Sequence, residues 1–183
     1  MHDGVPQGRI LLTAEDIAGR VWELAEAVSR DHEGRDLLLV GVLTGAFVFL
    51  SDLARALSIP VQVDFLATSS YGNATSSSGV VRILKDLDRD VKGMDVLLVE
   101  DIVDTGLTLA YLQSLLRTRG PARLRTCVLL DKTGRRQVPV HLDYCGFTVP
   151  DVFLVGYGLD HAERYRQLPY ILALEGDQGE ATR

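Results

Sequence analysis

The feature that most restricts the fold is a pair of uninterrupted apolar runs, at residues 37–42 and 96–99. A strand with apolar side chains on both faces must be buried on both faces, which is typical of parallel sheets covered by helices. Residues 61–66, 80–84, 123–130 and 152–155 predict further strands. We therefore expect an α/β fold, with a central and mainly parallel sheet flanked by helices on both faces.

Segments with apolar residues at helical spacing flank and separate these apolar runs. Thr13 has the position of a helix cap, and residues 14–30 carry apolar side chains at helical spacing. Two further helices are marked by the apolar positions Phe47, Leu50, Leu53, Ala54 and Leu57, and by Leu109, Leu112, Leu115 and Leu116. In a fold where helices alternate with buried parallel strands, ligands bind outside the carboxyl ends of those strands.

Composition excludes several classes of protein. The 183 residues suit a single domain, and the formal net charge of -6 argues against a nucleic-acid binder. No apolar run approaches the length of a membrane span, and the N-terminus does not read as a signal peptide. Cys127 and Cys145 lack metal-like spacing, which favours a reducing compartment without disulfides. We expect a cytoplasmic protein with no nucleic-acid or membrane partner.

The most informative segment is residues 96–109, where an apolar strand leads directly into Glu100 and Asp101. A short polar turn follows and a helix begins, so backbone N–H groups are offered to an anion. The two carboxylates suit the paired hydroxyls of a ribose. Taken one at a time, such residues are often helix caps or solvated strand ends. The ordered string as a whole favours a sugar-phosphate site.

The string from Glu100 to Thr108 resembles the phosphoribosyl-pyrophosphate motif of the type I phosphoribosyltransferases. The other landmarks resemble the hypoxanthine-guanine branch of that family, from about residue 10 to about residue 171. The resemblance implies a type I phosphoribosyltransferase fold in one domain, residues 1–183. Its core would span about 35–150, and a small hood over the base would come from the N-terminal segment and about 150–175.

The resemblance implies a role for each residue of the motif. Glu100 and Asp101 would hold the ribose hydroxyls. Asp104 would be the general acid or base at N7 of the purine, because the incoming base must lose a ring proton as N9 attacks the anomeric carbon. The 5′-phosphate would be wrapped by Asp104, Thr105, Gly106, Leu107 and Thr108.

A second landmark, the turn Leu43-Thr44-Gly45, follows the first buried strand. By resemblance its backbone amides hold pyrophosphate, although the family often has a lysine where Thr44 stands. From the residues alone it is an ordinary strand-to-helix turn. Arg166 matches an arginine that contacts pyrophosphate. A magnesium ion on the pyrophosphate keeps several waters and needs few protein ligands. Asp160, with Glu100 and Asp101, matches its ligands.

Two further landmarks concern the lid and the base. Ser70 and Tyr71 match a lid that closes over the reacting centre, although residues 69–79 alone favour a surface loop. Lys132 matches a donor to O6 of a 6-oxopurine, and otherwise is a solvated lysine at a strand end. Phe153 would stack on the purine, although periodicity alone favours core packing. Leu154 and Asp160 complete the purine-binding segment.

The resemblance therefore implies a magnesium-dependent purine-salvage enzyme that converts hypoxanthine or guanine, with phosphoribosyl pyrophosphate, to IMP or GMP and pyrophosphate. A dimer or tetramer is implied as well. One alternative is a phosphoribosyltransferase that prefers xanthine. The other is a nucleotide-sensing regulator that has kept the fold and lost catalysis, which the intact motif disfavours.

Overall fold

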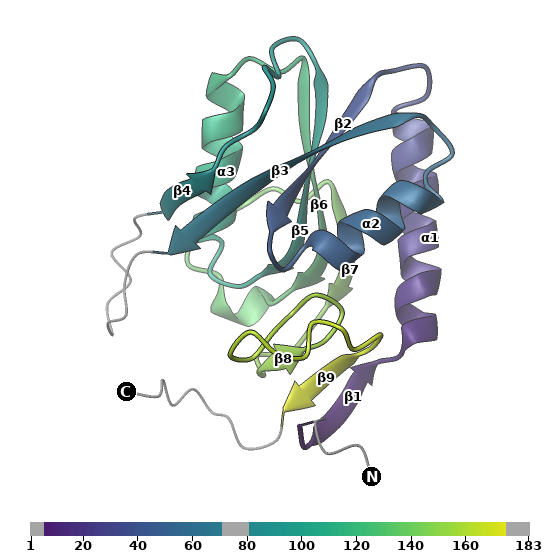
Figure 1. Cartoon of the computed structure of the whole chain (residues 1–183), viewed down its shortest axis with the longest axis vertical. Helices are drawn as coiled ribbons and strands as arrows, with labels where there is room; N and C mark the ends of the chain where they lie inside the picture. The colour runs from purple at the N-terminus through teal and green to yellow at the C-terminus, as the bar shows by residue number, and fades with distance from the viewer. Residues whose placement is uncertain (1–5, 71–80, 175–183) are drawn as a thin grey trace.

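The computed structural model describes residues 6–70 and 81–174. Its central sheet has six strands in the order β4-β3-β2-β5-β6-β7 (Figure 1). The neighbouring strands are parallel except for β3 and β4, which are antiparallel. The expected central, mainly parallel sheet is confirmed. Its strands are β2 (Leu37–Leu43), β3 (Val61–Ser70), β4 (Val81–Lys85), β5 (Asp95–Val103), β6 (Arg123–Asp131) and β7 (Tyr144–Thr148).

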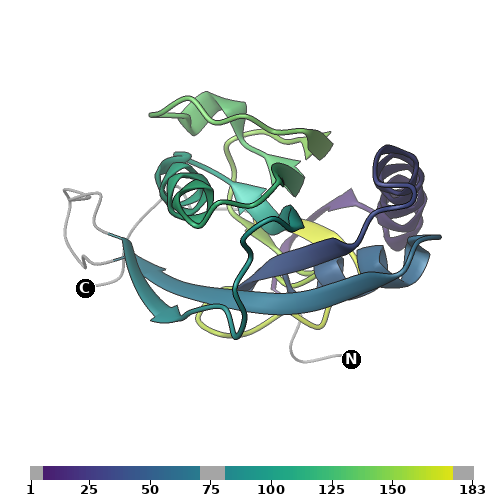
Figure 2. The same cartoon turned by 90° about the horizontal axis from the view of Figure 1, so that it is seen from above.

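Both faces of this sheet are covered, as the apolar runs predict. Leu37 and Leu39 pack with α1 (Ala14–Asp31) and α2 (Phe47–Ala56). Leu38 and Val40 point to the opposite face and pack with α3 (Leu107–Thr118). Seen from above, α3 and α1 lie well apart with strands between them (Figure 2). Successive side chains of a strand alternate between faces, so one uninterrupted apolar run supplies two core layers.

The first helix begins where the sequence predicts. Thr13 Oγ1 accepts the N–H of Asp16 at 3.1 Å, and Asp16 Oδ2 accepts the N–H of Thr13 at 3.0 Å. This reciprocal pair satisfies two N–H groups that the first turn would otherwise leave open. The helix ends at Asp31, and its buried face carries Ile17, Val21, Leu24, Ala25 and Val28.

A separate three-stranded sheet lies below the central sheet in Figure 1 and has the order β1-β9-β8. Its strands are antiparallel: β1 (Gly8–Leu12), β8 (Leu154–Val155) and β9 (Ile171–Leu174). The prediction that residues 152–155 add a strand to the parallel sheet is wrong, since only Leu154 and Val155 are extended and they pair with β9. Cys145 lies within β7.

The two sheets meet where the chemistry is expected. In Figure 1 the carboxyl ends of β2 and β5 point toward the smaller sheet. The turns that follow these strands are therefore placed between a rigid parallel core and the β1-β9-β8 sheet. Among the helices of the described residues, none is long and apolar enough to cross a membrane.

Candidate active site

The turn between β5 and α3 has a shape that glycine alone tolerates well. Gly106 has a φ of 85°, in the left-handed region that L side chains rarely adopt. A Cβ at this position would lie 3.0 Å from Val138 O. The carbonyl of Thr105 accepts the N–H of Gln137 at 2.9 Å. The turn is thus held by the segment after β6, without any ligand.

This turn encloses a small hollow at the start of α3. Its volume is about 140 Å³. Gly106 has no side chain to cap the helix, and the N–H of Leu107 makes only a long hydrogen bond, to Thr105 Oγ1 at 3.4 Å. A free helix N-terminus of this kind is a ready anion site. The hollow is lined by Glu100, Ile102, Val103, Asp104, Thr105, Gly106, Thr108 and Leu109.

Two carboxylates precede the hollow on β5, and both are costly to ionise in the free protein. Glu100 is buried and its Oε2 has no hydrogen-bond partner. Burial, with the neighbouring charge of Asp101, raises the pKa of Glu100 well above its usual range. Burial also raises the pKa of Asp101 to about 6, although Arg166 and the N–H of Ile102 act in the opposite direction. A cation or a set of hydroxyl donors would relieve this cost.

These carboxylates fit a hydrated magnesium ion better than a closed protein cage. Within the part of the chain that the structure describes, no three His, Cys, Asp or Glu side chains converge on a metal position. Asp160 Oδ1 lies 2.8 Å from Arg166 Nη2, and Asp160 Oδ2 accepts the N–H of Glu163 at 2.9 Å. Glu100 Oε2 is a buried oxygen without a hydrogen-bond partner, and so is Asp104 Oδ1. Magnesium carried by an anionic substrate needs no more than one or two protein carboxylates.

The turn after β2 is packed tightly between other segments. A Cβ on Gly45 would lie 1.7 Å from Asp101 Oδ2. A Cβ on Gly158 would lie 2.1 Å from Gly45 O. Arg166 donates to Gly158 O at 2.8 Å. The fold therefore brings Leu43, Thr44 and Gly45 together with Asp101, Asp160 and Arg166, and the Leu43–Thr44 peptide bond is cis.

Asp104 and Lys132 come from neighbouring strands. The N–H of Lys132 donates to Val103 O at 2.9 Å, which places Lys132 beside the residue that precedes Asp104. Asp104 is half-buried, and its Oδ1 lies 3.5 Å from Arg135 Nε. Arg135 Nε also lies 3.8 Å from Asp151 Oδ1. Sequence reasoning missed Arg135, whose contact with Asp104 is set by the fold.

The expected purine-binding segment offers an aromatic face. Periodicity alone favoured core packing for Phe153. Its side chain is instead 37% exposed, so Phe153 is not a core residue. It meets the ring of His161 edge-on, at 5.2 Å between centroids. Leu154 is buried in β8. No role for His161 was expected from the sequence, and the structure shows it as the partner of Phe153 in this aromatic pair.

Of the two residues expected on the lid, the structure describes only the backbone position of Ser70. Ser70 is the last residue of β3. Tyr71 lies outside the described residues. The pairing of Ser70 and Tyr71 on a lid therefore stays a prediction.

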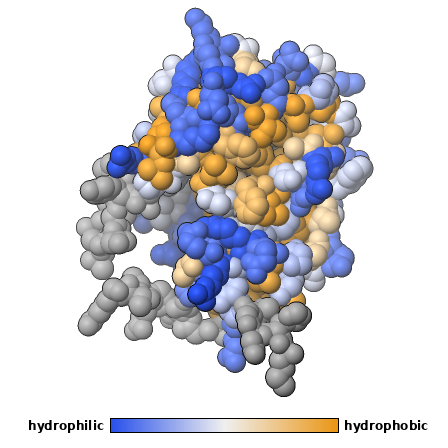
Figure 3. Space-filling model, viewed as in Figure 1, coloured by the Kyte–Doolittle hydropathy of each residue, from blue (hydrophilic) through white to orange (hydrophobic). Residues whose placement is uncertain are grey.

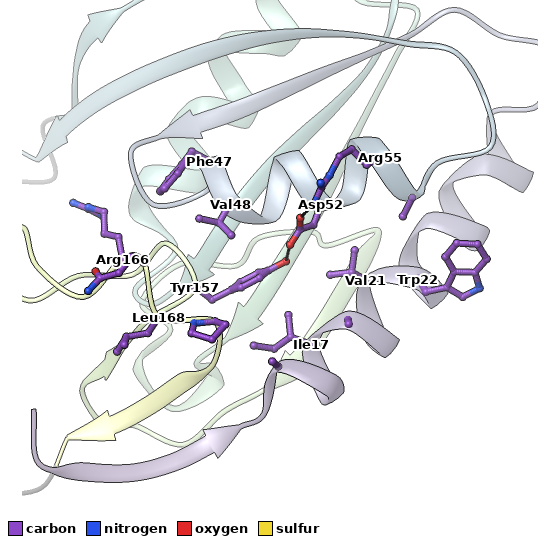
Figure 4. A pocket seen from close by; sticks show the side chains of 15 residues that line it. Ile17, Val21, Trp22, Phe47, Val48, Asp52, Arg55, Tyr157, Arg166 and Leu168 are labelled. Carbon is purple, nitrogen blue, oxygen red and sulfur yellow. Dashed lines mark hydrogen bonds and ion pairs between the residues drawn. The ribbon is translucent and has the colours of Figure 1, made fainter. Parts of the chain in front are cut away.

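A cavity of about 830 Å³ lies elsewhere (Figure 4). It runs between α1, α2 and the segment that contains Tyr157 and Leu168. Of the predicted site residues it shares Arg166 alone. The lining is mainly apolar, and the same face of the molecule shows broad apolar surface around α2 and β3 (Figure 3). Its apolar lining includes Ile17, Val21, Trp22, Phe47, Val48 and Leu168.

Comparison with known proteins agrees with this geometry. The family model of the phosphoribosyl transferase domain matches residues 9–162. The hypoxanthine-guanine phosphoribosyltransferase of Mycobacterium tuberculosis is 54% identical over 172 residues, which cover 91% of this chain and 85% of that protein.

Solved structures agree as well. The hypoxanthine-guanine phosphoribosyltransferase of Bacillus anthracis superposes with a TM-score of 0.88 at 44% identity, covering 92% of this chain and 99% of that one. The hypoxanthine phosphoribosyltransferase of Trypanosoma cruzi has a TM-score of 0.86 at 44% identity, covering 91% and 90%. That protein was solved in work on how its C-terminal region affects oligomeric state and activity.

Proposed function

Because the chain belongs to the hypoxanthine-guanine phosphoribosyltransferases, we propose that it moves the 5-phosphoribosyl group from phosphoribosyl pyrophosphate to N9 of hypoxanthine or guanine. The products are IMP or GMP and pyrophosphate. The observation that carries this proposal is the anion hollow at the start of α3, with Glu100 and Asp101 on one side and Asp104 beside Lys132 on the other.

The sugar phosphate is held by the β5–α3 turn in this proposal. Glu100 and Asp101 accept the ribose hydroxyls. The first N–H groups of α3 bind the 5′-phosphate, because they have no acceptor within the helix. The hydroxyls of Thr105 and Thr108 add donors. The phosphate contacts are completed by Asp104, Gly106 and Leu107.

The base is recognised by residues at the ends of β5 and β6. Asp104 lies where a carboxylate can manage the proton of the purine as N9 attacks the anomeric carbon. Lys132 donates to O6, which adenine lacks, so the protein selects 6-oxopurines. Phe153 stacks on the purine, and Leu154 contacts its edge through the backbone. The anomeric carbon passes through an oxocarbenium-like state.

The leaving pyrophosphate faces the Leu43-Thr44-Gly45 turn and Arg166. Arg166 stabilises the negative charge that grows on pyrophosphate as the bond to the sugar breaks. Bound magnesium would supply further positive charge at the pyrophosphate. Glu100, Asp101 and Asp160 are the residues we assign to it, and the buried partnerless oxygen of Glu100 supports this assignment.

The chain is proposed to act as one domain with a core of about residues 35–150. The β1-β9-β8 sheet belongs to a hood over the base, and Ser70 and Tyr71 to a closing lid. A homo-oligomer, as a dimer or tetramer, and a cytoplasmic location complete the proposal. The thiols of Cys127 and Cys145 are both free, which suits a reducing compartment.

An ultraviolet assay of the purified protein with phosphoribosyl pyrophosphate and magnesium tests the proposal. Hypoxanthine, guanine, xanthine and adenine are offered separately, each with a chelator control. Turnover of hypoxanthine or guanine with adenine inert is the expected result. Faster turnover of xanthine would favour the xanthine-preferring alternative. Binding of a purine nucleotide without turnover of any base would favour the sensing regulator.

A further inference from the structure

A partly buried hydrogen bond joins the 156–158 turn to α2. The hydroxyl of Tyr157 donates to Asp52 Oδ2 at 2.7 Å, and Figure 4 shows the ring reaching from its loop toward the helix. Tyr157 is 6% exposed and has a φ of 50°, a conformation that only a well-supported backbone keeps. Burial, with the hydrogen bond to Asp52, raises the pKa of Tyr157, so the hydroxyl stays a donor at neutral pH.

The turn that carries Tyr157 also contacts the Leu43-Thr44-Gly45 turn, which is the expected pyrophosphate site. The N–H of Gly158 donates to Arg166 O at 3.0 Å, and Arg166 Nη1 returns a bond to Gly158 O at 2.8 Å. The missing Cβ of Gly158 leaves room for Gly45 O, which would be 2.1 Å away from it. Gly45 in turn leaves room for the carboxylate of Asp101.

The residue that makes the hydrogen bond to Asp52, Tyr157, is therefore the neighbour in sequence of Gly158, which contacts Gly45. We propose that Asp52 and Tyr157 are a positioning pair, which holds the 156–158 turn on the Leu43-Thr44-Gly45 turn and so sets the geometry of the pyrophosphate subsite. This inference rests on the proposed function. Neither side chain is proposed to touch the substrate.

Packing alone does not replace this bond. Tyr157 belongs to the buried core cluster and also lines the large apolar cavity, so apolar packing surrounds the ring while the hydroxyl sets its direction toward α2. A hydrogen bond to a carboxylate is stronger and more directional than one between neutral groups. The other oxygen of Asp52 pairs with Arg55 one turn along α2, but the Arg55 side chain is exposed, so this ion pair contributes little to holding Asp52.

The test is steady-state kinetics and calorimetric binding with Tyr157→Phe, which keeps the ring and removes the donor. We expect KM and Kd for magnesium phosphoribosyl pyrophosphate to rise about 10-fold, since a hydrogen bond to a charged group contributes on that order. The KM for hypoxanthine and kcat at saturation should stay within about twofold, because the base and the proton transfer are handled by other residues.

Matched variants separate positioning from general damage. Asp52→Asn keeps an acceptor, so its KM for phosphoribosyl pyrophosphate should stay close to that of the parent protein. Asp52→Ala should raise this KM as much as Tyr157→Phe does. Combining Asp52→Ala with Tyr157→Phe should add nothing further, because one bond is being removed. Arg55→Ala removes the other partner of the same carboxylate and should leave KM for phosphoribosyl pyrophosphate unchanged.

Two results would overturn the positioning role while the parent protein is active. One is an unchanged KM for phosphoribosyl pyrophosphate in Tyr157→Phe. The other is an equal loss for both substrates, which would indicate a merely structural bond. An unmodified protein that turns over no purine base would instead overturn the proposed function on which this inference rests.

Discussion

At the scale of single residues, two carboxylates of the site are costly to ionise in the free protein. Glu100 and Asp101 both have raised pKa values because they are removed from water. Asp104 is half-buried, and its Oδ1 lies 3.5 Å from Nε of the exposed Arg135. Such unfavourable placement of binding groups is common at active sites and lowers the stability of the free protein.

Asp101→Asn should therefore stabilise the free protein. The pKa of Asp101 is about 6 in the folded protein, against 3.8 ordinarily, so between about pH 4 and pH 6 the folded state binds more protons than the unfolded state. The free energy of unfolding falls as pH rises through this window. At pH 7 we expect the variant to be more stable by about 1–2 kcal/mol, a gain that vanishes below about pH 4.

Urea unfolding at pH 4, 5, 6 and 7 measures this effect. Asp36→Asn, at an exposed position just before β2, is the control and should follow the parent protein at each pH. A constant difference between Asp101→Asn and the parent across this range would contradict the prediction.

Asp104→Asn should separate proton transfer from binding. The amide keeps the shape of the side chain but is no longer a proton acceptor, so kcat is expected to fall by about 100-fold or more. The Kd for phosphoribosyl pyrophosphate should change little, because the backbone of the β5–α3 turn does the binding. Near-normal turnover in steady-state kinetics would remove Asp104 from the acid-base role.

Lys132→Ala should weaken the discrimination between hypoxanthine and adenine. Lys132 is buried beside the residue before Asp104, which suits a donor aimed at the base. The ratio of kcat/KM for the two bases is expected to fall by about 10-fold or more, since the loss of a charged donor costs more than 1 kcal/mol. If the ratio stays the same, Lys132 does not read O6.

At the scale of elements, the site consists of turns that follow parallel strands, and close contact between those turns requires residues without a side chain. Gly45 is the clearest case, because the methyl group of Gly45→Ala would overlap Asp101 Oδ2. The variant must move either the carboxylate or the turn.

We expect Gly45→Ala to lose about 1–3 kcal/mol of stability and to raise KM for phosphoribosyl pyrophosphate by about 10-fold or more. Gly19→Ala is the control, since nothing lies within 4 Å of the added methyl group in α1. It should gain about 0.5–1 kcal/mol from helix propensity and keep normal kinetics. An unchanged KM in Gly45→Ala would show that the turn does not touch the substrate.

At the scale of the whole molecule, ligand binding should strengthen the link between the ends of the parallel strands and the segment after β7. The proposed site draws on the ends of β2, β5 and β6 and on residues 153–166, which we assign to the hood. Tyr157, Gly158 and Arg166 form the described link between that segment and the core turns.

Magnesium and phosphoribosyl pyrophosphate together should therefore raise the melting temperature. At a ligand concentration 100 times Kd the gain is about 2.7 kcal/mol, or roughly 5–10 °C for a domain of this size. Scanning calorimetry with and without a chelator measures it, and magnesium alone should have a much smaller effect. An equal shift in the presence of the chelator would argue against a metal in the bound complex.

The sequence by itself determined the elements with strong local patterns. The runs at residues 37–42 and 96–99 predicted buried parallel strands, and the structure places one half of each run against α1 and α2 and the other half against α3. Thr13 was recognisable as a cap because capping depends on neighbours in the chain. The string from Glu100 to Thr108 was readable for the same reason, since a turn that binds phosphate is built from consecutive residues.

The tertiary structure alone decided everything that depends on pairing between distant segments. β1, β7 and β9 were not expected from the sequence, and each is defined by its pairing with a strand elsewhere in the fold. β8 has two residues and exists because β9 pairs with it, which also removed residues 152–155 from the parallel sheet. Arg135 and the Tyr157–Asp52 pair became visible only once the chain was folded, because hydrogen bonds and ion pairs across the fold leave no local pattern in the sequence.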